Sequence, residues 1–282
     1  MSKSSGILIS EPVSPYSRLV VPLSKVIVDK KTRYQHVIIA ETLDFGKVLV
    51  LDDYIQSSSN DEFYYHESLV HPALFTHPNP QDVLIIGGGE GATLREVLKH
   101  GTVKKAVMVD IDGELLDITK EYLSEMHQGS FFDPRSVVLV DDGFKYVMNT
   151  QNKFDVVIID LIDPYIAESI ASPLYEKYFY ERVKSILNDG GIMVTQAGNS
   201  FFYKDIYQKV LLNIHQVFPI VREYDIWIPC YGYSVNYILG SLANDPGKLD
   251  AQTIRSLMIQ RNVKTRFYSP KIHLNWFRDD DI

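Results

Sequence analysis

The pattern of hydrophobic and polar positions changes once along the chain, at a turn-rich stretch over residues 77–80. Before it, β-rich or alternating runs cover residues 25–29, 34–41 and 47–51. Alternation with a period of two, bounded by turn residues, predicts strands. We therefore expect a small antiparallel β domain over residues 1–79, ending in a short helix over residues 66–75.

After the turn-rich stretch, short apolar runs alternate with segments of helical periodicity. The apolar runs cover residues 83–86, 106–109, 137–140, 156–159 and 192–195. The helical segments cover residues 92–100, 113–126, 142–149, 173–187 and 203–217. Strands that are apolar on both faces and separated by helices predict a parallel sheet covered on both sides. We expect an α/β fold with a doubly wound, Rossmann-like sheet over residues 80–282, with an antiparallel edge at residues 220–228 and 235–239.

Composition excludes several partners. The formal net charge is -8, with 36 acidic against 28 basic residues, which argues against binding to nucleic acid. No apolar stretch approaches the roughly 20 residues that cross a bilayer, and the N-terminus lacks the apolar run of a secretory signal. Cys230 is the only cysteine, so no intrachain disulfide can form. We expect a soluble cytoplasmic protein without a membrane partner.

Ligands of such sheets bind outside the carboxyl ends of the strands, and the residues there form a consistent set. Gly87-Gly88-Gly89-Glu90-Gly91-Ala92 follows the first apolar run and permits close approach of the backbone to a ligand. Asp110 ends the second run, where an acidic side chain typically accepts the hydroxyls of a ribose. Together the two features predict a nucleoside site.

Three more carboxylates follow the next strands. Asp142 comes after the third run, where it could lie near an adenine or equally cap the following helix. Asp160 and Asp163 follow the fourth run. Two like charges at one crevice are costly unless a cation joins them, so this pair predicts a positively charged substrate.

Other enzyme classes fit less well. The glycine turn also matches a dinucleotide fingerprint, and Tyr180 and Lys184 have the spacing of a short-chain dehydrogenase pair, but the Gly-x-x-x-Gly-x-Gly turn of that class is missing. His66 and His71 are five positions apart and diverge by about 140° on a helix, so we expect no metal site there. A hydrolase would need a Gly-x-Ser-x-Gly elbow, which the chain lacks.

These motifs, together with residues 61–67 and 228–231, resemble the polyamine aminopropyltransferase (spermidine synthase) family over nearly the whole chain. The resemblance implies transfer of the aminopropyl group of decarboxylated S-adenosylmethionine to an acceptor amine in polyamine biosynthesis. It also implies the fold of S-adenosylmethionine-dependent transferases, a co-substrate rather than a prosthetic group, and a homodimer or homotetramer. A methyltransferase and a non-catalytic nucleoside-binding protein stay open as alternatives.

The resemblance also assigns site residues. The donor would contact Gln35, His66, Gly87, Gly89, Glu90, Asp110, Asp142, Gly143 and Asp160. The acceptor side would comprise Gln56, Tyr65, Asp160, Asp163, Gln196 and Tyr231. Asp160, backed by Tyr65, would be the catalytic base.

Two departures from the common family pattern concern the acceptor. Glu90 and Asp110 look like the branch of thermospermine- and agmatine-type enzymes, and the N-terminal Trp that closes the putrescine end in some members has no counterpart. The acceptor could accordingly be putrescine, agmatine or a longer polyamine such as spermidine.

Overall fold

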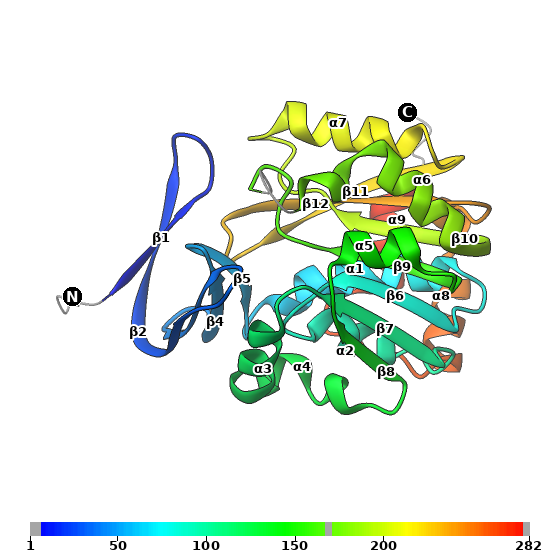
Figure 1. Cartoon of the computed structure of the whole chain (residues 1–282). Coiled ribbons are helices and arrows are strands. Elements are labelled where there is room, and N and C mark those ends of the chain that lie inside the picture. Colours follow the sequence, from blue (N-terminus) through cyan, green and yellow to red (C-terminus); the bar gives the residue numbers. More distant parts are fainter. Residues whose placement is uncertain (1–6, 167–170, 279–282) are drawn as a thin grey trace.

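The computed structural model describes residues 7–166 and 171–278, which form two sheets with helices packed around the larger one (Figure 1). The N-terminal sheet is antiparallel, and its strands follow chain order: β1 (Leu8–Pro12), β2 (Arg18–Lys31), β3 (His36–Thr42), β4 (Lys47–Leu51) and β5 (Tyr54–Ser58). Strands β1 and β2 extend as a long hairpin away from the body of the protein (Figure 1).

The larger sheet has the order β11-β12-β10-β9-β6-β7-β8. Its strands are β6 (Asp82–Gly87), β7 (Lys105–Asp110), β8 (Ser136–Val140), β9 (Phe154–Asp160), β10 (Leu187–Gln196), β11 (Ile220–Ile228) and β12 (Tyr233–Ser241). Strands β6 to β10 are parallel, whereas β11 and β12 form the antiparallel edge. The chain first builds outward from β6 to β8 and then returns to β9 on the other side of β6. The strand order therefore reverses between β6 and β9, where Gly87 pairs with Asp160.

Helices cover both faces of the larger sheet because consecutive residues of its strands are apolar, which makes both faces apolar. Val83 and Ile85 face one core cluster, and Leu84 and Ile86 face another. The first face is covered by α1 (Glu62–Thr76), α2 (Ala92–Leu98) and α9 (Pro270–Phe277), with α8 (Ala251–Gln260) packed against α9, and the second by α5 (Gly143–Asn149), α6 (Lys177–Ile186) and α7 (Lys204–His215).

A third cluster joins the two sheets. Val37, Ile39 and Leu49 of the N-terminal sheet pack against Leu115 and Met126, from α3 (Gly113–Tyr122) and α4 (Ser124–His127). All five side chains are almost completely buried. This packing gives the crevice between the sheets a fixed wall.

The expected α/β fold and its parallel strands are confirmed, but several boundaries differ. The helix predicted over residues 113–126 is interrupted at Leu123, whose φ of -118° and ψ of 39° are not helical. Helix α1 begins at Glu62, before the predicted start, and the segment predicted as helix over residues 173–187 is a 3₁₀ turn, then α6, then the start of β10. Strands β1 and β5 and helices α8 and α9 were not predicted. Among the described helices, none is long and apolar enough to cross a membrane.

Candidate active site

A cavity of about 300 Å³ lies at the point where the strand order reverses. Its walls come from the loops that follow β6, β7, β8 and β9, and from β1, β4, β5 and the turn between β11 and β12. Of the fourteen residues predicted for the site, twelve line it: Gln35, Gln56, Tyr65, Gly87, Gly89, Glu90, Asp110, Asp142, Gly143, Asp160, Asp163 and Tyr231. The sequence therefore identified most of the acidic residues in the wall.

The glycine turn brings β6 and β9 into contact at the floor of the cavity. Gly87 has a φ of +84°, and a Cβ atom there would lie 2.1 Å from the carbonyl oxygen of Asp160. The next residue, Gly88, donates its backbone N–H to the same carbonyl at 3.1 Å. A side chain at Gly87 would thus break this contact and displace the end of β9.

Asp110 lies at the end of β7 and is almost buried, with its Oδ1 accepting the backbone N–H of Asp112 at 2.9 Å. Burial raises the pKa of the Asp110 carboxyl to about 6. The neighbouring Asp112 accepts the Thr32 hydroxyl at 2.6 Å and the Gln35 side-chain amide at 2.9 Å. Asp112 thereby fixes Gln35 of the N-terminal sheet beside the ends of the parallel strands.

Asp142 caps helix α5. Its Oδ1 accepts the backbone N–H groups of Phe144 at 2.9 Å and Lys145 at 3.3 Å, while the residue also lines the cavity. Gly143 follows at a position where a Cβ atom would lie 2.6 Å from Ile86 Cγ2. The helix N-terminus can therefore approach β6 closely.

Two hydroxyl groups hold Asp160. Tyr65 donates to its Oδ1 at 2.7 Å, and Thr93 of α2 donates to its Oδ2 at 2.6 Å. Burial and the charge of Glu90 raise the pKa of the Asp160 carboxyl. Burial and the charge of Asp160 hold the pKa of Tyr65 well above its usual value, so Tyr65 keeps its proton. Asp160 is thus a hydrogen-bond acceptor in a fixed orientation.

Asp163 lies further along the same wall, among tyrosines. Tyr165 donates its hydroxyl to Asp163 Oδ2, and the Tyr233 hydroxyl lies 3.4 Å from the same atom. Burial raises the pKa of Asp163 to about 6. None of the ion pairs found among residues 7–166 and 171–278 includes Asp160 or Asp163.

Sequence reasoning missed Glu11, which strand β1 brings into the cavity wall. The side chain is 1% exposed, and its only hydrogen bond among the described residues comes from the backbone N–H of Ile55, at 3.3 Å. Burial raises its pKa to about 8, with a smaller contribution from the charge of Asp163. A carboxylate within the apolar run of residues 7–13 was the available sequence signal.

Two predicted site residues lie behind the lining. His66 is buried on α1 and contacts Glu90, with 2.9 Å between Nε2 and Oε1. Gln196 is also buried, and its side chain bonds to the Leu161 carbonyl at 2.6 Å and to the backbone N–H of Gly198 at 2.8 Å. Gln196 therefore braces the loop that carries Asp163.

Glu67, His71 and Glu96 form a second buried group, with one possible ligand atom of each lying within 4.8 Å of the others. These atoms already have partners. His71 contacts Glu96 and His100, each at 3.0 Å, and the Glu67 carboxylate accepts three backbone N–H groups of residues 266–268. The group joins α1, α2 and the C-terminal segment as a hydrogen-bonded brace.

The fold places the chain in the α/β class of S-adenosylmethionine-dependent transferases, and the wall of its crevice is acidic. The profile of the spermine/spermidine synthase domain matches residues 62–246, and that of the spermidine synthase tetramerisation domain matches residues 7–59.

Individual proteins similar to the chain carry names of the same family. The polyamine aminopropyltransferase of Pyrobaculum aerophilum is 54% identical over 278 residues, covering 97% of this chain and 95% of its own. The spermidine synthase of Thermotoga maritima superposes with a TM-score of 0.90 at 32% identity, covering 98% of this chain and 92% of its own. A spermidine synthase solved with the transition-state analogue AdoDATO gives the same TM-score and identity, covering 98% and 93%. The chain belongs to the spermine/spermidine synthase family and is an enzyme of aminopropyl transfer.

Proposed function

We propose that the enzyme moves the aminopropyl group of decarboxylated S-adenosylmethionine to an acceptor that carries at least two positive centres, such as putrescine, agmatine or a triamine. One observation carries this proposal: Asp160, Asp163 and Glu11 line one cavity, and no Lys or Arg pairs with them among the described residues. Buried carboxylates without a cation are costly, and a bound polyamine would neutralise them.

The donor would occupy the end of the cavity formed by the parallel strands. Asp110 would accept the ribose hydroxyls, and Asp142 with the start of α5 would lie beside the adenine; both residues line the cavity. Glu90 would face the ammonium of the aminopropyl arm. An intact S-adenosylmethionine would bring a carboxylate towards Glu90 and Asp160 and would be repelled, which accounts for selection of the decarboxylated donor.

The main requirement of the reaction is that the acceptor amine be positioned in line with the carbon–sulfur bond that breaks. The acceptor nitrogen attacks the methylene beside the sulfonium, the carbon–sulfur bond breaks, and the electron pair leaves on a neutral thioether, 5′-methylthioadenosine. The proton lost by the nitrogen would pass to Asp160, whose pKa is raised by burial and by Glu90. Tyr65 and Thr93 would keep that carboxylate aimed at the nitrogen.

The acceptor would lie between Asp160 and Glu11. Asp163 and Glu11 would bind the distal positive centres, and Tyr231 and Gln56 would line its path; the Tyr231 hydroxyl already bonds to the Gln56 carbonyl. An ammonium near each acid would return the carboxylate to its charged form. This favours acceptors longer than putrescine or with a guanidinium group.

The donor assignment can be tested by comparing decarboxylated with intact S-adenosylmethionine. We expect the decarboxylated donor to raise the melting temperature and, with a polyamine, to release 5′-methylthioadenosine. Equal stabilisation by the intact donor, together with methyl transfer, would contradict the proposal.

We further propose a cytoplasmic homotetramer assembled through the N-terminal sheet. Residues 7–59 match a tetramerisation domain, and Ile7, Leu8 and Val20 of the hairpin are more than half exposed, at 65%, 55% and 51%. The single cysteine, Cys230, is consistent with a reducing compartment. A monomer by light scattering at micromolar concentration would refute the assembly.

A further inference from the structure

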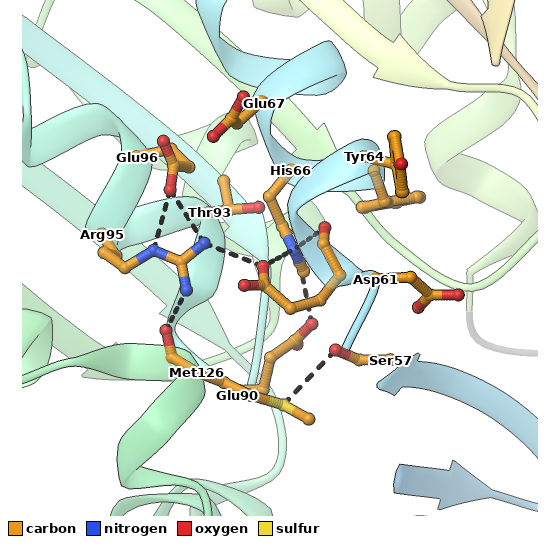
Figure 2. A network of polar contacts seen from close by, with 12 residues as sticks. Ser57, Asp61, Tyr64, His66, Glu67, Glu90, Thr93, Arg95, Glu96 and Met126 are labelled. Atoms are coloured by element: carbon orange, nitrogen blue, oxygen red, sulfur yellow. Dashed lines mark hydrogen bonds and ion pairs between the residues drawn. The ribbon is translucent and has the colours of Figure 1, made fainter. Parts of the chain in front are cut away.

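A buried chain of charged groups extends from the cavity wall into the interior, between α1 and α2. Glu90 contacts His66 (Figure 2), His66 contacts Glu62, and Glu62 contacts Arg95. The distances are 2.9 Å, 2.8 Å and 2.8 Å. Only Glu90 of these four lines the cavity. The other three lie behind the wall and are at most 7% exposed.

The geometry around His66 requires a proton on both ring nitrogens. Nδ1 lies 2.8 Å from the backbone carbonyl of Glu62 and 2.8 Å from Glu62 Oε2, and both are acceptors. Nε2 lies 2.9 Å from Glu90 Oε1, which is also an acceptor. An imidazolium satisfies all three contacts, whereas a neutral ring would set a lone pair against a carboxylate. The hydrogen bonds that the ring donates to Glu62 and Glu90 accordingly raise the pKa of His66 to about 10, although burial opposes this shift.

Arg95 fixes the far end of the chain. Its Nη2 donates to Glu62 Oε2. Figure 2 shows its other two contacts: Nε donates to Glu96 at 2.8 Å, and Nη1 donates to the carbonyl of Met126 in α4. The guanidinium is thus held by three separate segments, and it leaves Glu62 little freedom to turn away from His66.

We propose that Glu62 is a positioning residue for the donor: through His66 it holds the Glu90 carboxylate in one orientation at the cavity wall, and Arg95 fixes Glu62 for this role. The inference rests on the proposed function, in which Glu90 faces the ammonium of the aminopropyl arm. A mobile Glu90 would meet that ammonium in many orientations, so donor binding would weaken while the reacting nitrogen, near Asp160, would be little affected.

The substitution Glu62→Gln tests this role with little change in shape. Glu62 Oε2 accepts from both His66 and Arg95, so an amide oxygen in its place keeps both hydrogen bonds and removes only the charge. Arg95 also retains Glu96 and the Met126 carbonyl. Asp245→Asn is a matched control, because it removes a carboxylate from another arginine pair, at 2.8 Å from Arg222, outside the cavity lining.

The first readout is the titration of His66 by ¹⁵N NMR on the donor-free enzyme, which needs no turnover. His66 faces Glu62 and Tyr65 on its own helix, Glu90 on the glycine turn and Asp160 on β9. Loss of one facing carboxylate should lower the titration midpoint by about 1–3 pH units in Glu62→Gln. The midpoint should stay parental in Asp245→Asn. An unchanged midpoint in Glu62→Gln would overturn the inference.

The second readout separates positioning from folding. Glu62→Gln should raise the donor KM about 10-fold, the lower end of what loss of an orienting partner costs, with a smaller change in kcat. The defect should grow between pH 7 and pH 9, as the variant's His66 loses its proton. A loss of kcat alone, with a parental pH profile, would indicate a merely structural residue and contradict the inference.

Glu62→Asp serves as a second variant, including the case in which Glu62→Gln does not fold. It keeps the charge but shortens the side chain, so His66 should stay doubly protonated while the donor KM rises above the parental value. A parental KM would contradict positioning. If the parent enzyme itself releases no 5′-methylthioadenosine, the proposed function fails, and the titration of His66 still decides whether Glu62 sets its protonation.

Discussion

The two ends of the cavity differ in how their charged groups are held. At the proposed donor end Glu90 contacts the His66 ring, Asp142 accepts backbone N–H groups at a helix start, and Asp110 accepts one at a strand end. At the proposed acceptor end Asp163 and Glu11 have only hydroxyl and backbone partners among the described residues. The acidic groups of the proposed donor end thus have fixed partners without a ligand, whereas the proposed acceptor end contains buried carboxylates that a bound polycation would neutralise.

Asp160 lies where the two ends meet, and its substitution should have the largest effect. Asp160→Asn keeps the shape and the contact with Tyr65 but removes the base, so turnover should fall at least ~10²-fold, with donor binding retained. Steady-state rates and donor affinity measure this. Asp155→Asn is the control, because Asp155 lies at the opposite end of the same strand. Near-parental turnover of Asp160→Asn at pH 7 would show that Asp160 is not the base.

Asp110→Ala should damage the donor end alone. Hydrogen bonds to a charged group contribute about 1.5–3 kcal/mol each, so loss of the ribose contacts should weaken donor binding by at least ~10-fold. Calorimetric titration with the donor checks this, with Asp117→Ala on the exposed side of α3 as the control. Unchanged affinity would show that Asp110 only stabilises the turn before α3.

Glu11→Gln should damage the acceptor end alone. The KM for a triamine should rise about tenfold, equivalent to about 1.4 kcal/mol, while the donor KM stays parental. Glu41→Gln, elsewhere in the N-terminal sheet, is the matched control. A rise in the donor KM instead would indicate that Glu11 contacts the donor, and it would contradict the assignment of Glu11 to the acceptor end.

The smallest expected effect is the change that Glu11→Gln makes to the pH dependence of folding stability. The folded-state pKa of Glu11 is raised to about 8, so the native state binds this proton more tightly than the unfolded chain does. Stability is therefore lost as pH rises from the unfolded value, about 4.3, towards 8. The melting temperature of Glu11→Gln should equal that of the parent at pH 4 and exceed it at pH 9. Saturating spermidine should reduce this difference in melting temperature. A difference in melting temperature that does not depend on pH would contradict the conclusion that Glu11 is a buried carboxyl without a charged partner.

The same contrast explains what the sequence could predict. Gly87, Asp110, Asp142 and Asp160 each follow an apolar strand of one parallel sheet, so local pattern places them together. Glu11 reaches the cavity only because β1 pairs with β2 and the N-terminal sheet packs on α3 and α4. Such long-range packing leaves no local periodicity, and β1 is a short edge strand that ends at a proline.

Other misses have similar causes. No glycine or proline marks the end of α3 at Leu123 in the sequence. The helix ends there because Leu123 packs in a buried cluster, not because of a local backbone preference. The division of the chain into residues 1–79 and 80–282 stays a prediction, since α1 precedes that boundary yet packs on α2 and β10. The roles of the individual site residues also stay predictions.

The most direct test of the account is to compare catalytic efficiencies for putrescine, agmatine, norspermidine and spermidine at one donor concentration. Because Asp163 and Glu11 would bind positive centres beyond the reacting nitrogen, agmatine or a triamine should be used at least as well as putrescine, and a simple monoamine should be poor. Strict preference for putrescine would contradict the open acceptor end, and efficient use of a monoamine would contradict the role of its carboxylates.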